Sequence, residues 1–163
     1  MTESEKKATS DAEFNVNDYW INRWNTGKIR FHREEMHILA DKGHNVVGVD
    51  IAEQAFQEFF TDQNLEYTVE ELKDNTGKLF TSKDGKIKLY CMDIFKFSKD
   101  FEGQFNAIWD RGAFAAIIPK TRERYAQVIK GLLSPDCHYM IATMQYDLSL
   151  FPGKSRMVEQ DTL

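Results

Sequence analysis

The stretch Gly43-His44-Asn45-Val46-Val47-Gly48-Val49-Asp50-Ile51 decides the fold of this chain. Its valines are β-branched and favour a strand that is covered on both faces, as in a parallel sheet. Gly43 follows a short helical pattern, where a glycine with positive φ can end a helix. A helix that runs into a buried strand predicts a doubly wound α/β sheet. Asp50 would then stand at the carboxyl end of the strand, where such sheets bind nucleotides.

Two roles for Asp50 agree with this position. Its carboxylate can accept hydrogen bonds from both hydroxyls of a ribose. Aspartate also starts helices well, so Asp50 can instead cap the helix that follows. That helix is predicted to be amphipathic, with an apolar face formed by Ala55, Phe56, Phe59 and Phe60.

Size and composition set further bounds. A chain of 163 residues predicts one domain, and a net charge of −5 argues against nucleic acid as a partner. Cys91 and Cys137 lie far apart within apolar runs, which favours reduced core thiols and a cytoplasmic location. No apolar run approaches the length of a membrane span, which argues against a membrane partner. Residues 1–13 lack the apolar core of a signal peptide, and residues 1–16 are predicted to be a disordered lead-in.

A second acidic residue follows a predicted strand. Residues 78–92 are predicted to form a hairpin with Asp84-Gly85 as a two-residue turn, and Asp93 comes directly after its second strand. At the same edge of the sheet as Asp50, the Asp93 carboxylate can accept a hydrogen bond from a base amino group. Asp93 can equally cap a turn or a helix, and both roles stay open.

Another strand is predicted to run from Gln104 into a loop at Ala113, with Asp110 and Arg111 at its end. The planar guanidinium of Arg111 suits a planar or anionic ligand. An Asp110–Arg111 ion pair of purely structural value explains the same two residues equally well.

The remaining segments supply the rest of the predicted framework. Residues 64–78 are predicted to be a polar loop, and residues 137–145 a further buried strand. Ser134-Pro135 is predicted to end the helix between them, for which Thr121 is a candidate cap. The apolar face of that helix comprises Tyr125, Val128, Ile129, Leu132 and Leu133.

Aromatic residues gather near the N-terminus. Trp20 and Trp24 share one face of a predicted short helix, and Phe31 follows it. These side chains either pack on the domain as a lid or wall a ligand pocket, as aromatic residues often do. His32 and His37 are five residues apart, which is wrong for the zinc-binding helix of a metallopeptidase, so no metal site is predicted.

One expected feature is missing from the sequence. A nucleotide-binding α/β domain normally opens with a strand and a glycine-rich turn about 20 residues before the ribose-binding acid. Counting back from Asp50 leads to the region of Arg30, where there is neither an apolar strand nor a pair of glycines. The lack of this turn also removes the main support for a nicotinamide-dependent oxidoreductase.

The chain resembles the thiopurine S-methyltransferase family, whose members use S-adenosyl-L-methionine and have a Rossmann-like fold. The resemblance covers most of residues 17–147, which are taken as a truncated methyltransferase domain followed by a divergent tail at 148–163. The runs Ile108-Trp109-Asp110-Arg111-Gly112 and Gly43 to Asp50 are the most distinctive. The other matching stretches are WINRWNTGKIRFH (20–32), LADKGHNVVGVDIAEQAFQEFFTDQN (39–64), GKIKLYCMDIF (85–95), FNAIWDRGA (105–113) and Tyr146-Asp147.

The resemblance implies a role for each site residue. The segment from Trp20 through Trp24 to Phe31 would close over the cofactor, and Phe31 would also touch the thiopurine. Asp50 would bind the ribose, in a position where relatives carry Glu.

Asp93 and Ile94 would flank the adenine, although relatives often have Ser at the position of Asp93. Arg111 would lie against both cofactor and substrate. The reaction needs no side-chain nucleophile, because the sulfonium methyl is already activated, so no catalytic residue is assigned.

Two departures from the family pattern qualify this picture. The family's first strand and its glycine-containing loop, expected between His37 and Leu39, are absent, as though about thirty residues had been removed. The family's chain also continues beyond Tyr146-Asp147 with further elements. The expected fold is therefore an α/β, Rossmann-like class I methyltransferase sheet that lacks its first strand and its C-terminal strands. The expected function is methyl transfer to an aromatic thiol by a monomer, impaired in this chain, with an inactive splice-type product as the alternative.

Overall fold

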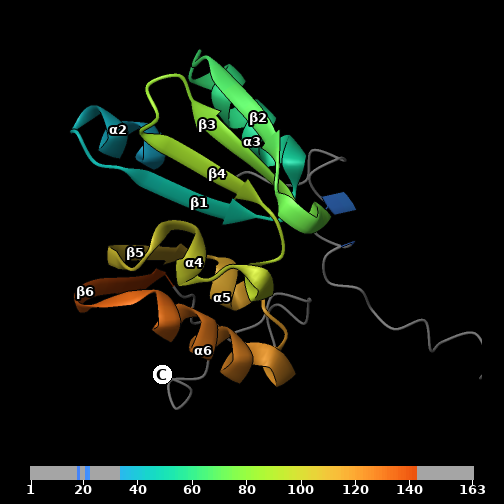
Figure 1. The fold of residues 1–163 in the computed structure, drawn as a ribbon. Helices are drawn as coiled ribbons and strands as arrows, with labels where there is room; N and C mark the ends of the chain where they lie inside the picture. Colours follow the sequence, from blue (N-terminus) through green and yellow to red (C-terminus); the bar gives the residue numbers. More distant parts are fainter. Residues whose placement is uncertain (1–17, 19–20, 23–33, 143–163) are drawn as a thin grey trace, which may run out of the picture.

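The computed structural model describes residues 18, 21–22 and 34–142 of the chain (Figure 1). The strands are β1 (Val46–Asp50), β2 (Tyr67–Glu71), β3 (Lys78–Ser82), β4 (Ile87–Cys91), β5 (Phe105–Arg111) and β6 (Leu133–Ala142). The α-helices are α2 (Glu34–Asp41), α3 (Glu53–Asp62), α4 (Lys99–Glu102), α5 (Ala113–Ala116) and α6 (Arg122–Leu132). Three 3₁₀ turns are η1 (Lys73–Asn75), η2 (Ile94–Lys96) and η3 (Pro119–Thr121).

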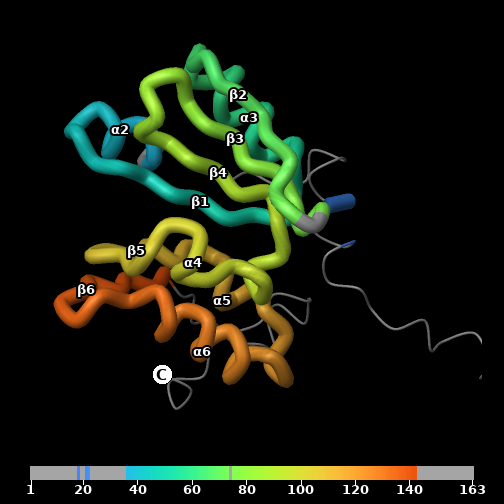
Figure 2. The backbone as a smooth tube through the Cα atoms, in the orientation of Figure 1, coloured from blue at the N-terminus to red at the C-terminus, as the bar shows by residue number. Residues whose placement is uncertain are grey.

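The strands form two separate sheets rather than one. The first sheet has the order β1-β4-β3-β2, in which β1 and β4 are parallel and the other neighbours are antiparallel. The second sheet consists of β5 and β6, which are parallel. β5 is drawn next to β1 in Figures 1 and 2, and Val47, Val49 and Ile108 pack against one apolar cluster, but no strand pairing joins the two strands. The predicted α/β fold with an incomplete sheet is confirmed.

Two apolar clusters cover the two faces of β1. On one face, Val46 packs against a cluster that includes the fully buried Phe59 and Leu89. On the other face, Val47 and Val49 pack against a second cluster, which also holds Ile108 of β5. The second cluster therefore links the two sheets through side chains alone.

The helix that leads into β1 ends as the sequence predicts. Gly43 has a φ of +91°, and its backbone N–H donates to the carbonyl of Ala40 at 2.9 Å. α2 has only eight residues and buries Ala40, whereas Ile38 and Leu39 are 50% and 44% exposed. Leu39 lies outside the buried face because the helix turns only the side of Met36 and Ala40 toward the core.

The burial of two strands differs from the prediction. All residues of β1 are half-buried rather than fully covered, since β1 is the edge strand of its sheet. The last strand begins at Leu133 instead of Cys137 and is mostly exposed, with Met140 47% accessible. In the described part of the chain, no helix covers the face of β6 that carries Met140.

Two connections also differ from the prediction. Residues 64–78 include the exposed edge strand β2 and the turn η1, and are not simply a loop. The hairpin between β3 and β4 is confirmed, but its connection runs over residues 83–86 and is longer than a two-residue turn. Asp84 braces it by accepting from the Ser82 hydroxyl at 2.6 Å and the Lys86 N–H at 3.1 Å.

Two glycines should respond oppositely to alanine. Gly85 has a φ of +74° in the hairpin connection, so Gly85→Ala should lower the free energy of unfolding by about 1 kcal/mol through backbone strain. Gly131 lies in α6 with open space where a Cβ would stand, so Gly131→Ala should raise it by about 0.5–1 kcal/mol. Urea denaturation of both variants measures the difference, and a shift of the same sign in both would contradict this account.

Candidate functional site

The parallel pairing of β1 and β4 brings two predicted site residues to one edge of the sheet. Asp50 stands opposite Cys91 in the register, and the Met92 N–H donates to the Asp50 carbonyl at 2.9 Å. Asp93 and Ile94 follow immediately, at the start of η2. Asp50, Asp93 and Ile94 therefore lie at the carboxyl edge, where doubly wound sheets bind their ligands.

The Asp50 side chain takes part in the turn that leads to α3. Its Oδ1 accepts a hydrogen bond from the Ala52 N–H at 2.9 Å, while Ala52 occupies the helix N-cap position. Asp50 thus supports the start of the helix from two residues before it. This contact engages one carboxylate oxygen. The alternative that Asp50 is the N-cap of the following helix is wrong, because Ala52 occupies that position and the Asp50 carboxylate bonds to the turn before it.

Asp93 has a similar local contact. It is the N-cap of η2, and its Oδ1 accepts from the Phe95 N–H at 3.0 Å. Ile94 is half-buried and packs against the cluster that links the sheets. Asp93 therefore does what its alternative role predicts, and no described residue hydrogen-bonds its second oxygen.

Arg111 belongs to the other sheet. It is the last residue of β5 and is exposed, whereas its neighbour Asp110 is 3% exposed and points inward. Because successive strand residues face opposite sides, the two side chains diverge. The alternative of an Asp110–Arg111 ion pair is wrong.

Asp110 instead lies at the centre of a buried hydrogen-bond network. It accepts from the Phe114 N–H at 3.1 Å and from the hydroxyls of Tyr125 and Tyr139 at 2.8 and 2.9 Å. Burial, followed by the nearby Asp110 carboxylate, raises the pKa of both tyrosines well above the ordinary value of 10.0. Asp110 thereby ties β5, α5, α6 and β6 together directly beside Arg111.

The sequence analysis missed this network. The only available signal was the period of two along β5, which turns Asp110 away from Arg111. The tyrosines lie 15 and 29 residues further along the chain, so no local pattern joins them to Asp110.

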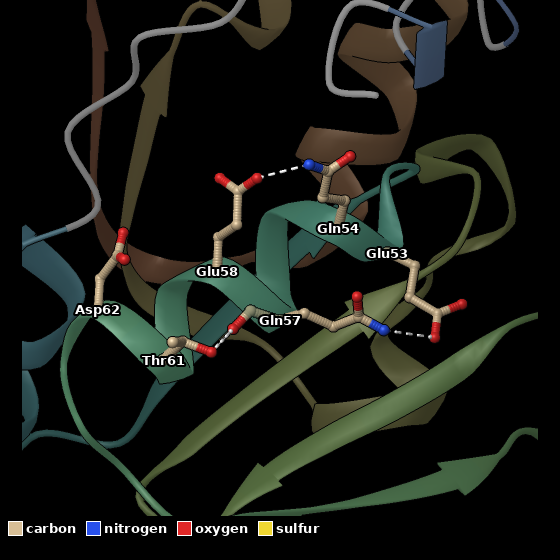
Figure 3. A pocket seen from close by; sticks show the side chains of 6 residues that line it. All are labelled: Glu53, Gln54, Gln57, Glu58, Thr61 and Asp62. Carbon is tan, nitrogen blue, oxygen red and sulfur yellow. Dashed lines mark hydrogen bonds between the residues drawn. The ribbon is translucent and has the colours of Figure 1, made fainter. Parts of the chain in front are cut away.

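Trp20, Trp24 and Phe31, the other predicted cofactor residues, lie outside the described residues. A depression of about 570 Å³ lies elsewhere, over the outer surface of α3 (Figure 3). Its described lining comprises Glu53, Gln54, Gln57, Glu58, Thr61 and Asp62. Asp50, Asp93, Ile94 and Arg111 do not line it, so it is distinct from the predicted site.

The described residues contain neither a metal-binding cluster nor a membrane-spanning helix. No group of three or more His, Cys, Asp or Glu side chains is arranged to hold a metal ion in this part of the chain. None of the described helices combines the length and the apolar character needed to cross a bilayer.

The half-buried Cys91 at this edge should react slowly. Burial, reinforced by the carboxylates of Glu53 and Asp50, raises the pKa of the Cys91 thiol to about 11. A Cys137→Ser variant should therefore react with a disulfide reagent at pH 8 about 100-fold more slowly when folded than when unfolded in urea, because the thiolate is the reacting form. Equal rates in the two states would show that the thiol is unperturbed.

The family comparison identifies the class of protein. The family model described as Thiopurine S-methyltransferase (TPMT) matches residues 33–163. The chain is accordingly an α/β methyltransferase with a Rossmann-like sheet, and this sheet is incomplete. It belongs to the thiopurine S-methyltransferase family.

Similar proteins agree with this assignment. The probable thiopurine S-methyltransferase of Danio rerio is 38% identical over 88% of this chain and 76% of its own length. The thiopurine S-methyltransferase of Rattus norvegicus is 38% identical, covering 90% of this chain and 77% of the relative. That of Equus caballus is 36% identical, covering 90% and 75%.

These alignments contain more of each relative than of this chain. The Danio rerio alignment spans 176 residues, whereas 88% of this chain is about 143 of its 163 residues. About 33 residues of that relative therefore have no counterpart within the aligned region. This deficit is close to the thirty or so residues that the sequence analysis expects to be absent between His37 and Leu39.

Proposed function

We propose that this chain is a shortened thiopurine S-methyltransferase in which methyl transfer from S-adenosyl-L-methionine to the sulfur of an aromatic or heterocyclic thiol is impaired. The observation that carries the proposal is the broken strand order. β1 and β5 belong to two sheets that no strand pairing joins. This order supports a nucleotide-type site of which only one half has its framework, because a strand and loop for the other half are not among the described residues.

The described edge fits the adenosine half of S-adenosyl-L-methionine better than its methionine half. The Asp50 and Asp93 carboxylates suit ribose hydroxyls and a base amino group, and Ile94 offers an apolar surface for the adenine ring. No glycine-rich turn precedes β1 in the described residues to let the backbone approach the methionine portion. When bound, the cofactor supplies an activated methyl group on a sulfonium.

The remaining roles belong to residues of this chain. Asp50 and Asp93 orient the nucleoside, while Trp20, Trp24 and Phe31 exclude water from it. Phe31 and Arg111 contact the acceptor, and the Arg111 guanidinium stabilises the anionic thiolate form of the thiol. Positioning and desolvation supply the catalysis, and no side chain acts as a nucleophile.

We expect this chain to bind the cofactor product weakly. Isothermal titration of the purified chain with S-adenosylhomocysteine should give no saturable binding at micromolar concentration, since half of the pocket lacks its framework. The Danio rerio relative is the matched control and should bind under the same conditions. Micromolar affinity for this chain would contradict the impairment.

The alternative is a catalytically inactive product that acts only through association or is unstable. The observation that favours it is that one edge of β1 has no pairing strand among the described residues, because open strand edges invite pairing with other chains. Sequencing the transcript across the His37–Ile38 junction would show whether the shortened chain is made in cells. Uninterrupted coding sequence at that junction would support a genuine short form. The methyltransferase proposed above is a cytoplasmic monomer with its domain at 17–147, preceded by a lead-in and followed by a divergent tail.

A further inference from the structure

Two neighbouring strands have open edges in this molecule. In the part of the chain that the structure describes, β1 pairs only with β4 and β5 pairs only with β6. Val47 and Val49 of β1 pack against the same apolar cluster as Ile108 of β5, and Figures 1 and 2 show the two strands next to each other. In Figure 1 they run in the same direction. Two parallel strands that face each other without pairing leave two rows of backbone donors and acceptors open.

The hydrogen bonds of β1 show which of its groups face the opening. The Val46 N–H donates to the Lys86 carbonyl at 2.8 Å, and the Asp50 carbonyl accepts from the Met92 N–H at 2.9 Å. Alternate residues of a parallel strand bond to the same neighbour, so Val46 and Asp50 bond toward β4. The N–H and C=O groups of Val47 and Val49 therefore point away from β4, toward β5.

The surroundings of the opening suit an apolar strand. Residues on the two sides of β1 pack against different apolar clusters, so a strand inserted beside it would meet apolar side chains on both faces. Insertion requires a spacing of about 9–10 Å between β1 and β5, which is twice the usual strand separation. To reach this spacing the two strands need to disrupt only side-chain packing, because no strand pairing joins the two sheets.

We infer that the open edges of β1 and β5 form a binding site for an extended, apolar, β-branched peptide segment supplied by another polypeptide. Doubly wound sheets have the strand order 3-2-1-4-5, in which the first strand lies between the strands that correspond to β1 and β5. The deficit of about 33 residues relative to the Danio rerio protein is long enough to include such a strand. The bound segment runs parallel to both neighbours and donates to and accepts from Val47 and Val49.

The test uses amide hydrogen exchange of the full chain with and without a synthetic peptide. The peptide carries the strand segment of the Danio rerio relative that has no counterpart in this chain. Saturating peptide should slow exchange at Val47 and Val49 by about tenfold or more, because their N–H groups gain partners. Exchange at Val46, which is already bonded to β4, should change much less. No cofactor is present, so the outcome is independent of the proposed methyl transfer.

A backbone-modified peptide is the matched control. N-methylation at alternate residues keeps every side chain but removes the donors on one side of the peptide, and it should abolish the protection. Equal protection by the N-methylated peptide, or no protection by the unmodified one, would overturn the inference. Protection of Val47 and Val49 in a free chain that sediments as a dimer would also overturn it, since a second copy would then occupy the edge.

Discussion

Asp110→Ala should lower the free energy of unfolding by about 3–5 kcal/mol, because removal of a buried charged acceptor leaves its donors without a partner. Three donors depend on this carboxylate, namely the Phe114 N–H and the hydroxyls of Tyr125 and Tyr139. Such a loss is a large fraction of the stability of an ordinary domain. Urea denaturation followed by circular dichroism measures it.

Asp136→Ala is the matched control. Asp136 is an exposed carboxylate on β6, in the same sheet, and its loss should change the stability by less than about 0.5 kcal/mol. Similar destabilisation by both substitutions would show that the network around Asp110 has no special value.

The two tyrosines should make the stability of this network fall at alkaline pH. Because the folded state raises the pKa of Tyr125 and Tyr139, their contribution to stability is fully present below the unfolded pKa of 10.0. It is lost progressively as the pH rises above that value toward the folded pKa.

Restoring the missing stretch should have the other large effect. Insertion of the unmatched segment of the Danio rerio relative after His37 should raise the affinity for S-adenosylhomocysteine at least about 100-fold, or about 2.7 kcal/mol. The segment would supply a strand between β1 and β5 and a glycine loop that approaches the cofactor. Isothermal titration of both chains provides the measurement.

The control is an insertion of equal length that is rich in glycine and serine. It distinguishes the effect of the segment's sequence on cofactor affinity from the effect of its length. This linker cannot form an apolar strand, so it should leave the affinity unchanged. If the native segment folds into the chain, as judged by hydrogen exchange at Val47 and Val49, but does not improve binding, then its absence is not the cause of impairment.

The sequence predicts those elements whose burial pattern is regular. The valine-rich run of β1, the phenylalanine face of α3 and the alternation in β4 each predict an element that the structure contains. β2 was missed although Tyr67 and Val69 alternate with Thr68 and Glu70, because the acidic residues of this exposed edge strand made the segment look like a polar loop. The exposure of β6 was not foreseeable from its apolar residues, since burial depends on what covers the strand.

Some features of the candidate site can likewise be predicted from the sequence, whereas others cannot. Asp50 and Asp93 are recognisable from their place after a strand, because the parallel register carries both to one edge. Their hydrogen bonds to Ala52 and Phe95 are local. The sequence offered the capping role of Asp93 as an alternative, whereas Asp50 bonds to the turn and leaves the N-cap position of α3 to Ala52. The tyrosine partners of Asp110 are distant in sequence and emerge only from the packing of α6 and β6 on β5.

The link between the sheets has a consequence for how this protein responds to temperature. Val47, Val49 and Ile108 meet in one apolar cluster, whereas no ladder of hydrogen bonds spans the junction. Apolar contact weakens on cooling, while hydrogen-bonded ladders lose little. On cooling, the four-stranded sheet and the β5-β6 sheet should therefore separate from each other before either of them unfolds.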